Sequence, residues 1–172
     1  MGKAKAWRLW VRHALIALMV LVAGPAGAEP GDALSCAYFS PDPDDRTGPP
    51  IRFRADLSDD AQRAPTDSPG VGHADFVLDR DTLKLSWRIS FENLTSRPMG
   101  LQLHGPVPAE GEAPALFDVA PERFSSPVEG ERTLSLGEVA HLVQNLIYVN
   151  LRTTKYPEGE IRGRVRKLRP KC

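Results

Sequence analysis

The sequence predicts a single all-β domain, built as a sandwich or barrel of antiparallel strands with one short helix. Three observations support this prediction. Apolar and polar residues alternate with a period of two through much of residues 51–168, as expected when one face of each strand is buried. The alternating segments are short and are separated by turns rich in Gly, Pro and Asp. Only one segment has the capping residues and apolar spacing of a helix.

Three strands are expected to open the domain. In the first, at 51–57, apolar residues alternate with Arg and Asp. After a loop rich in Asp, Pro and Gly, the segments 74–79 and 83–91 alternate in the same way. They predict an antiparallel hairpin with one buried face. The connection at Arg80-Asp81 lacks glycine, so we expect a type I or longer turn.

The rest of the domain is predicted to consist of short strands with one helix between them. Strands are expected at 100–105, 114–120, 130–134, 146–153 and 159–168. Ser135 is a candidate helix N-cap, and Glu138 stands three residues later, as in a capping box. Val139, Leu142 and Val143 then follow at helical spacing. We therefore expect a short helix between the third and fourth of these strands.

The first 28 residues have the features of a secretory signal peptide. A positively charged start precedes an uncharged apolar stretch at 14–23, and small residues at 26–28 supply a cleavage site. The alternative, a membrane anchor, needs about 20 apolar residues, and Gly-Pro at 24–25 interrupts the stretch earlier. We expect cleavage before Glu29, a secreted or periplasmic location, and no transmembrane segment after cleavage.

Cleavage would leave 144 residues, which is one domain by length. Residues 29–50 are expected to form an N-terminal segment and linker, 51–168 the folded domain, and 169–172 a C-terminal tail. The full chain has 22 basic and 22 acidic residues, and the mature chain has 18 and 22, a formal charge of −4. This balance argues against nucleic acid as a partner.

Cys36 and Cys172 lie near the two ends of the mature chain. In an oxidising compartment we expect them to form one disulfide. In the chain-entropy model such a long loop stabilises the fold by about 4–5 kcal/mol. Two free thiols, or an intermolecular link through Cys172, remain the alternatives. Neither cysteine has the C-x-x-C or Cys/His spacing of a metal site.

Four segments occur in an order typical of one domain family. They are FRADLS at 53–58, LHGP at 103–106, YVN at 148–150 and PEGEIRG at 157–163. Together they resemble the CHRD domain of chordins and of many exported bacterial proteins, over about residues 51–166. The resemblance implies an immunoglobulin-like or superoxide-dismutase-like Greek-key β-sandwich or barrel, and it attaches no general biochemical activity.

The resemblance also raises a metal-binding alternative. CHRD domains commonly contain a His-x-His-Gly segment and a further histidine just before the threonine that follows the YVN segment. Here Gln102 and Arg152 stand at two of these positions, and only His104 remains. Because a stable metal site needs three or four ligands, we interpret His104 as structural and expect no cofactor. A metal-binding or redox-related protein of superoxide-dismutase-like shape is the alternative.

The three positions suggest a candidate polar cluster. Gln102 and His104 are expected on one strand face. If Arg152 occupies the family's histidine position, its guanidinium would lie near both. A permanent cation would then fill the space of a metal and oppose metal entry.

A basic stripe is predicted near the C-terminus. Arg162, Arg164 and Arg166 alternate with Ile, Gly and Val, which places them on the outer face of one strand. Two interpretations remain open. The stripe is either a solvated edge that discourages aggregation or a contact surface for an acidic polysaccharide, lipid head groups or an acidic protein.

The sequence contains no catalytic arrangement that we can identify, such as G-x-S-x-G, an activated cysteine or a metalloprotease helix. Glu158 and Glu160 are two carboxylates of the kind used in acid–base catalysis, but we expect them to be exposed turn residues or ion-pair partners, with Arg162 as a candidate partner. The Asn-Leu-Thr triplet at 93–95 fits a glycosylation sequon and is interpreted as a turn. We therefore predict a non-catalytic exported module for binding or extracellular structure. Its partner is unknown: a protein, a polysaccharide or an anionic surface.

Overall fold

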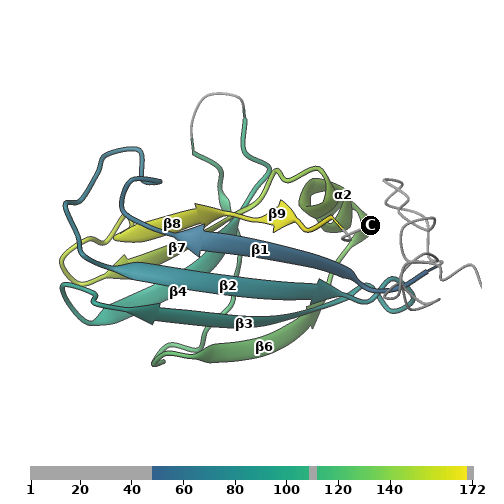
Figure 1. Ribbon diagram of the computed structural model, residues 1–172, viewed down its shortest axis with the longest axis horizontal. Helices are drawn as coiled ribbons and strands as arrows, with labels where there is room; N and C mark the ends of the chain where they lie inside the picture. The colour runs from purple at the N-terminus through teal and green to yellow at the C-terminus, as the bar shows by residue number, and fades with distance from the viewer. Residues whose placement is uncertain (1–47, 109–111, 170–172) are drawn as a thin grey trace, which may run out of the picture.

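The computed structural model describes residues 48–108 and 112–169. The predicted signal peptide, Cys36, Cys172 and nearly all of the segment 29–50 lie outside these residues. Within them, two antiparallel sheets enclose one hydrophobic core, and one short helix lies at the end of the sandwich beside β9 (Figure 1). The expectation of an all-β sandwich with one short helix is therefore confirmed. In the described part of the chain no helix has the length and apolar character needed to span a membrane.

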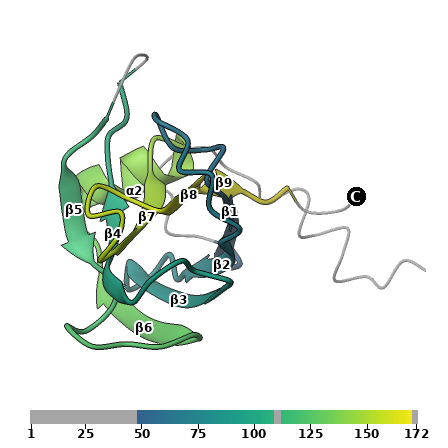
Figure 2. The same ribbon diagram turned by 90° about the vertical axis from the view of Figure 1, so that its left-hand side faces the viewer.

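The first sheet has the strand order β6-β3-β2-β1-β9, and the second has the order β5-β4-β7-β8. The first contains β1 (Ile51–Leu57), β2 (Val71–Leu78), β3 (Lys84–Glu92), β6 (Val128–Thr133) and β9 (Arg166–Lys167). The second contains β4 (Pro98–His104), β5 (Ala115–Asp118), β7 (Tyr148–Thr153) and β8 (Ile161–Arg164). Seen after a 90° turn, the two sheets lie on opposite sides of the interior (Figure 2).

The period-two alternation sends every second side chain into the core. In β1, Phe53, Ala55 and Leu57 are buried between exposed neighbours. The register pairs Phe53 with Phe76 and Ala55 with Ala74, so inward residues of adjacent strands meet. Burying a large side chain such as Phe53 or Leu57 stabilises the fold by roughly 1.5–3 kcal/mol. The second sheet contributes the facing buried residues Leu101, Leu103, Val149, Leu151 and Ile161.

The predicted helix is present as α2 (Leu136–Val143). The Ser135 hydroxyl accepts the N–H of Glu138, and the Glu138 carboxylate accepts the N–H of Ser135. Both bonds of the expected capping box are therefore formed. Val139 and Leu142 point into the core and fix the helix against the sandwich.

The last strand differs from its expected range of 159–168. It is divided into β8, which belongs to the second sheet, and β9, which belongs to the first. Val165 lies between them, is fully buried, and donates its N–H to the Ile147 carbonyl at 2.9 Å. The chain thus crosses from one sheet to the other at Val165, because the sheet edges converge there.

Candidate functional site

The candidate polar cluster lies on the outer face of the second sheet. In the pairing of β4 with β7, His104 is opposite Tyr148, Gln102 is opposite Asn150, and Arg152 is opposite Gly100. In both strands these positions alternate with the core residues Leu101, Leu103, Val149 and Leu151, and Gly100, Tyr148 and Asn150 are themselves buried. Arg152 stands four positions after Tyr148 along β7, a rise of about 13 Å. The residues share a face, but Arg152 does not lie beside His104.

His104 is held by contacts within the domain. Its Nδ1 donates to the Ala113 carbonyl at 2.9 Å, and its ring stacks on Tyr148 with centroids 4.8 Å apart and planes 15° apart. The Tyr148 hydroxyl donates to the same carbonyl at 3.3 Å. Burial raises the pKa of Tyr148. These contacts support the structural interpretation of His104.

Arg162, from the predicted basic stripe, lies over the Tyr148 ring of this stack. Its guanidinium carbon lies 4.2 Å from the Tyr148 ring centroid, and it reaches the ring from β8, on the side of β7 opposite to β4. Such a contact over an aromatic ring is worth about 0.5–2 kcal/mol. Arg162 therefore packs against the outer face of the second sheet. The alternation in the sequence did not distinguish it from Arg164 and Arg166.

Gln102 and Arg152 each have a different environment from His104. Gln102 donates through Nε2 to Asp118 on β5 at 2.9 Å. The Arg152 guanidinium lies over Gly100, where a Cβ atom would come within 2.6 Å of its Nη2. Gly100 thus makes room for this side chain. The three side chains thus contact different neighbours and do not point toward one shared site.

No group of three or more His, Cys, Asp or Glu side chains in the described residues is placed to hold a metal ion. His73 lies between two carboxylates on the outer face of the first sheet. Its Nδ1 is 2.7 Å from Asp56 Oδ1, and its Nε2 is 3.2 Å from Asp75 Oδ2.

Ser90 lies opposite His73 in the register of β2 and β3, but its hydroxyl donates to the His73 backbone carbonyl at 3.4 Å. With both ring nitrogens facing carboxylates, His73 and Ser90 do not form a nucleophile–base pair.

Glu160 overturns the expectation that it is an exposed turn residue or an ion-pair partner. Its side chain is fully buried. One carboxylate oxygen accepts the Ser68 hydroxyl and the Thr95 N–H, each at 2.6 Å, and the other accepts the Thr153 hydroxyl at 2.6 Å. Burial raises the pKa of Glu160, but these hydrogen bonds outweigh it and hold the pKa below its ordinary value.

The segment around Glu160 connects a long loop to the second sheet. The Asn150 amide donates to the Glu158 carbonyl at 2.8 Å and accepts from Gln62 at 3.0 Å. Gly159 has a φ of 145°, which favours glycine, and a Cβ there would overlap Asn150 Oδ1. The PEGE segment at 157–160 therefore works as a structural anchor. Its partners lie up to 94 residues away in sequence, so spacing alone did not reveal it.

The edges of the two sheets meet along a seam between β1 and β8. Ser58 and Arg162 exchange two backbone hydrogen bonds, at 3.1 and 3.0 Å. Beside this bridge, Gly163 approaches so closely that an added Cβ would overlap the carbonyl oxygen of Asp56. The glycine allows the strands to close.

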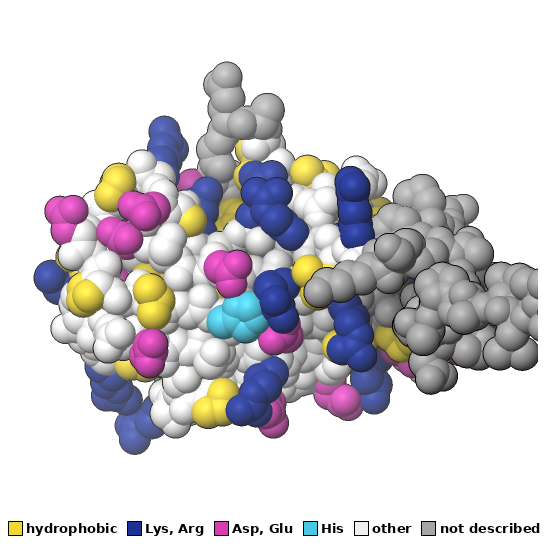
Figure 3. Space-filling model, in the orientation of Figure 1, with side chains coloured by type: hydrophobic (Ala, Val, Ile, Leu, Met, Phe, Trp, Pro, Cys, Tyr) yellow, Lys and Arg dark blue, Asp and Glu magenta, His cyan; other side chains and the backbone are white. Residues whose placement is uncertain are grey.

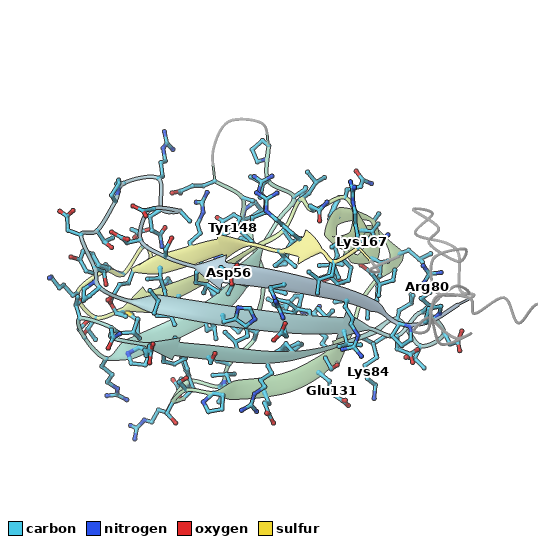
Figure 4. The ribbon with its side chains drawn as sticks, viewed as in Figure 1. Asp56, Arg80, Lys84, Glu131, Tyr148 and Lys167 are labelled. Carbon is cyan, nitrogen blue, oxygen red and sulfur yellow. The ribbon has the colours of Figure 1, made fainter. Side chains whose placement is uncertain are left out.

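A groove of about 390 Å³ lies on this seam, and we call it the seam groove. It is lined by Arg54, Asp56, Ala61, Gly163, Arg164, Arg166 and Leu168. The backbone register places Arg54 directly opposite Arg166. Figure 3 shows basic side chains gathered where β8 passes into β9. Figure 4 shows Asp56 on β1, pointing outward below this crossing.

The predicted stripe is therefore divided by the fold. Arg162 packs on Tyr148, whereas Arg164 and Arg166 are exposed and line the seam groove from the two sides of Val165. Arg54 already pairs with Asp75 at 3.2 Å. Within the ranges that the structure describes, neither Arg164 nor Arg166 has an ion-pair partner.

Comparison with known proteins gives one match. The family model described as the CHRD domain matches residues 53–165. No curated protein matches the chain, and no solved structure does.

Proposed function

The chain belongs to the CHRD domain family, and on that premise we propose that it is an exported, non-catalytic module that binds an anionic partner through the seam groove. CHRD domains are β-sandwiches that are generally non-enzymatic and occur in extracellular or periplasmic proteins. Export of this chain would follow from the signal features at 1–28. The mature N-terminus would then be Glu29.

The observation that carries the proposal is the uncompensated positive charge in the seam groove. On the outer face of the first sheet, Arg54 pairs with Asp75 and Arg88 pairs with Glu129. Arg166 instead stands opposite another arginine, and like charges in this position are destabilising. A bound anion would remove this repulsion, and guanidinium groups suit carboxylate and similar anions through paired hydrogen bonds.

Removing the two unpaired arginines is expected to weaken binding to anionic surfaces. The wild-type domain should be retained on heparin and elute with salt, whereas the Arg164→Ala/Arg166→Ala double variant should elute at clearly lower salt. Each charged hydrogen bond lost is worth roughly 1.5–3 kcal/mol. The matched control is Arg88→Ala/Arg97→Ala, which removes the same charge elsewhere and should elute with the wild type.

The control also separates the proposal from the solvated-edge interpretation. If the Arg164/Arg166 double variant co-elutes with the wild type, the arginines only protect an edge. If both double variants elute at the same lowered salt concentration, retention on heparin depends on overall charge rather than on the seam groove.

Export is tested by expressing the full chain in a bacterial host. We expect protein recovered from outside the cytoplasm to begin at Glu29, because the small residues at 26–28 precede it. N-terminal sequencing measures this. A chain of full length held in the membrane would contradict the proposal of cleavage.

A further inference from the structure

We propose that the seam groove is a subsite for an acidic sugar of a polysaccharide, with the arginines holding its carboxylate or sulfate and Asp56 accepting a hydroxyl. This inference rests on the proposed function and adds the chemical class of the ligand. It is carried by three features of the groove: its cations, its one carboxylate and its apolar walls.

The cations come from both sheets and face one groove. Arg164 is the last residue of β8 and Arg166 the first of β9, with the inward-facing Val165 between them. Arg54, which pairs with Asp75, adds a third guanidinium from β1, opposite Arg166. The backbones of three strands fix where these arginines leave the sheet, whereas their exposed side chains become ordered only when an anion binds. The volume of about 390 Å³ is in the range of sites for small ligands.

Asp56 decides between a sugar and a plain anion. Its side chain is 85% exposed, and its Oδ1 accepts from His73 at 2.7 Å. Its Oδ2 has no hydrogen bond within the described residues. This oxygen can accept a hydrogen bond from a ligand hydroxyl, but it repels a phosphate or a planar anionic membrane. A polyhydroxylated anion satisfies both the arginines and the aspartate.

The remaining walls suit the carbon skeleton of a sugar. Ala61, Gly163 and the 38% exposed Leu168 line the groove beside the charged groups. They add small or apolar surface to a groove whose other lining residues are charged. Such a mixture of apolar walls with a few placed polar groups is typical of small-ligand sites.

The experiment compares ligands by isothermal titration calorimetry with the mature protein. The probes are a uronic-acid hexasaccharide, a neutral hexasaccharide, inorganic polyphosphate of matched charge, and phosphatidylglycerol vesicles. We expect the uronate to bind at least tenfold more tightly than the neutral sugar and the polyphosphate, with an affinity that falls as salt rises. The Arg164→Ala/Arg166→Ala variant should lose at least tenfold in uronate affinity.

The Asp56→Ala variant is expected to change the affinities for the uronate and for polyphosphate in opposite directions, which separates a sugar subsite from a general anion site. It should weaken uronate binding about five- to tenfold, because the hydroxyl acceptor is lost, but tighten polyphosphate binding, because a negative charge is lost. Asp60→Ala, the matched control, should change both equally and little. Tighter binding of both probes by Asp56→Ala would overturn the inference.

Two further outcomes separate the inference from the proposed function. If polyphosphate or vesicles bind through the arginines at least as tightly as the uronate, the sugar assignment is wrong and the anion-binding module stands. If no anion binds in a salt-dependent manner, both fail.

Discussion

Replacement of Glu160 by alanine is expected to lower the free energy of unfolding by about 3–5 kcal/mol. The carboxylate accepts hydrogen bonds from Ser68, Thr95 and Thr153 in a fully buried position. Without it, these donors lose their charged acceptor, and each unsatisfied buried group costs roughly 1–3 kcal/mol. Urea unfolding of the wild type and the variant measures the difference.

Glu158 provides the matched control for this prediction. It is exposed and lies two residues earlier, and its contact with Asn150 uses the backbone carbonyl rather than the carboxylate. Glu158→Ala is therefore expected to change stability by less than about 0.5 kcal/mol. Equal stabilities for the two alanine variants would show that Glu160 is not an anchor.

Acidification should reproduce part of the Glu160 effect. Its pKa is lowered in the folded state, so its contribution to stability is present above the ordinary glutamate pKa of about 4.3 and is lost as pH falls toward the lowered value. The stability difference between the wild type and Glu160→Gln should shrink over that window. A difference that stays constant below pH 4 would contradict the assignment of a charged Glu160.

Replacement of Gly163 by alanine is expected to destabilise the domain by about 2–4 kcal/mol. The new Cβ would overlap the Asp56 backbone, which cannot rotate away as a side chain can. Overpacking of this kind costs about 1–3 kcal/mol. Separation of the strands would also weaken the two backbone bonds between Ser58 and Arg162, each worth about 1 kcal/mol. Thermal and urea unfolding measure the change.

Gly137 is the matched glycine for this comparison. It lies in α2, and nothing stands within 4 Å of the position that its Cβ would occupy. Gly137→Ala should stabilise the domain by about 0.4–1 kcal/mol, because alanine restricts the unfolded chain and favours helix. If Gly163→Ala changes the free energy of unfolding by as little as Gly137→Ala does, β1 and β8 do not approach each other as closely as described here.

The elements that the sequence predicts correctly depend on local patterns. Strands at 51–57 and 83–91 alternate with a period of two, because each has one face on the core. The helix after Ser135 has its capping box within four residues. In both cases the partners that decide the structure are close in sequence or are the core itself.

The features that the sequence did not predict depend on contacts between distant segments. The buried Glu160 carboxylate accepts hydrogen bonds from Ser68 and Thr95, which lie 92 and 65 residues away in sequence. The division of the final strand at Val165 depends on where the two sheet edges meet. The position of Arg152 relative to His104 depends on the register of β4 and β7. None of these long-range contacts can be read from the local alternation of apolar and polar residues.

The family-like segments and the proposed binding residues thus have different roles. Gly159, Glu160 and Gly163 belong to the PEGEIRG segment and hold the fold together through hydrogen bonds and close approach. Arg164 and Arg166 follow this segment and remain available to a ligand at the seam. We infer that the segment builds the edge on which the binding residues of this chain are placed.

The most direct measurement of the central claim is an NMR titration of the mature domain with the uronic-acid hexasaccharide. If the seam groove is the binding site, the largest amide shift changes will occur at Arg54, Gly163, Arg164, Arg166 and Leu168, and they will disappear in high salt. Shift changes centred on Gln102, His104 and Arg152, on the outer face of the second sheet, would contradict the account.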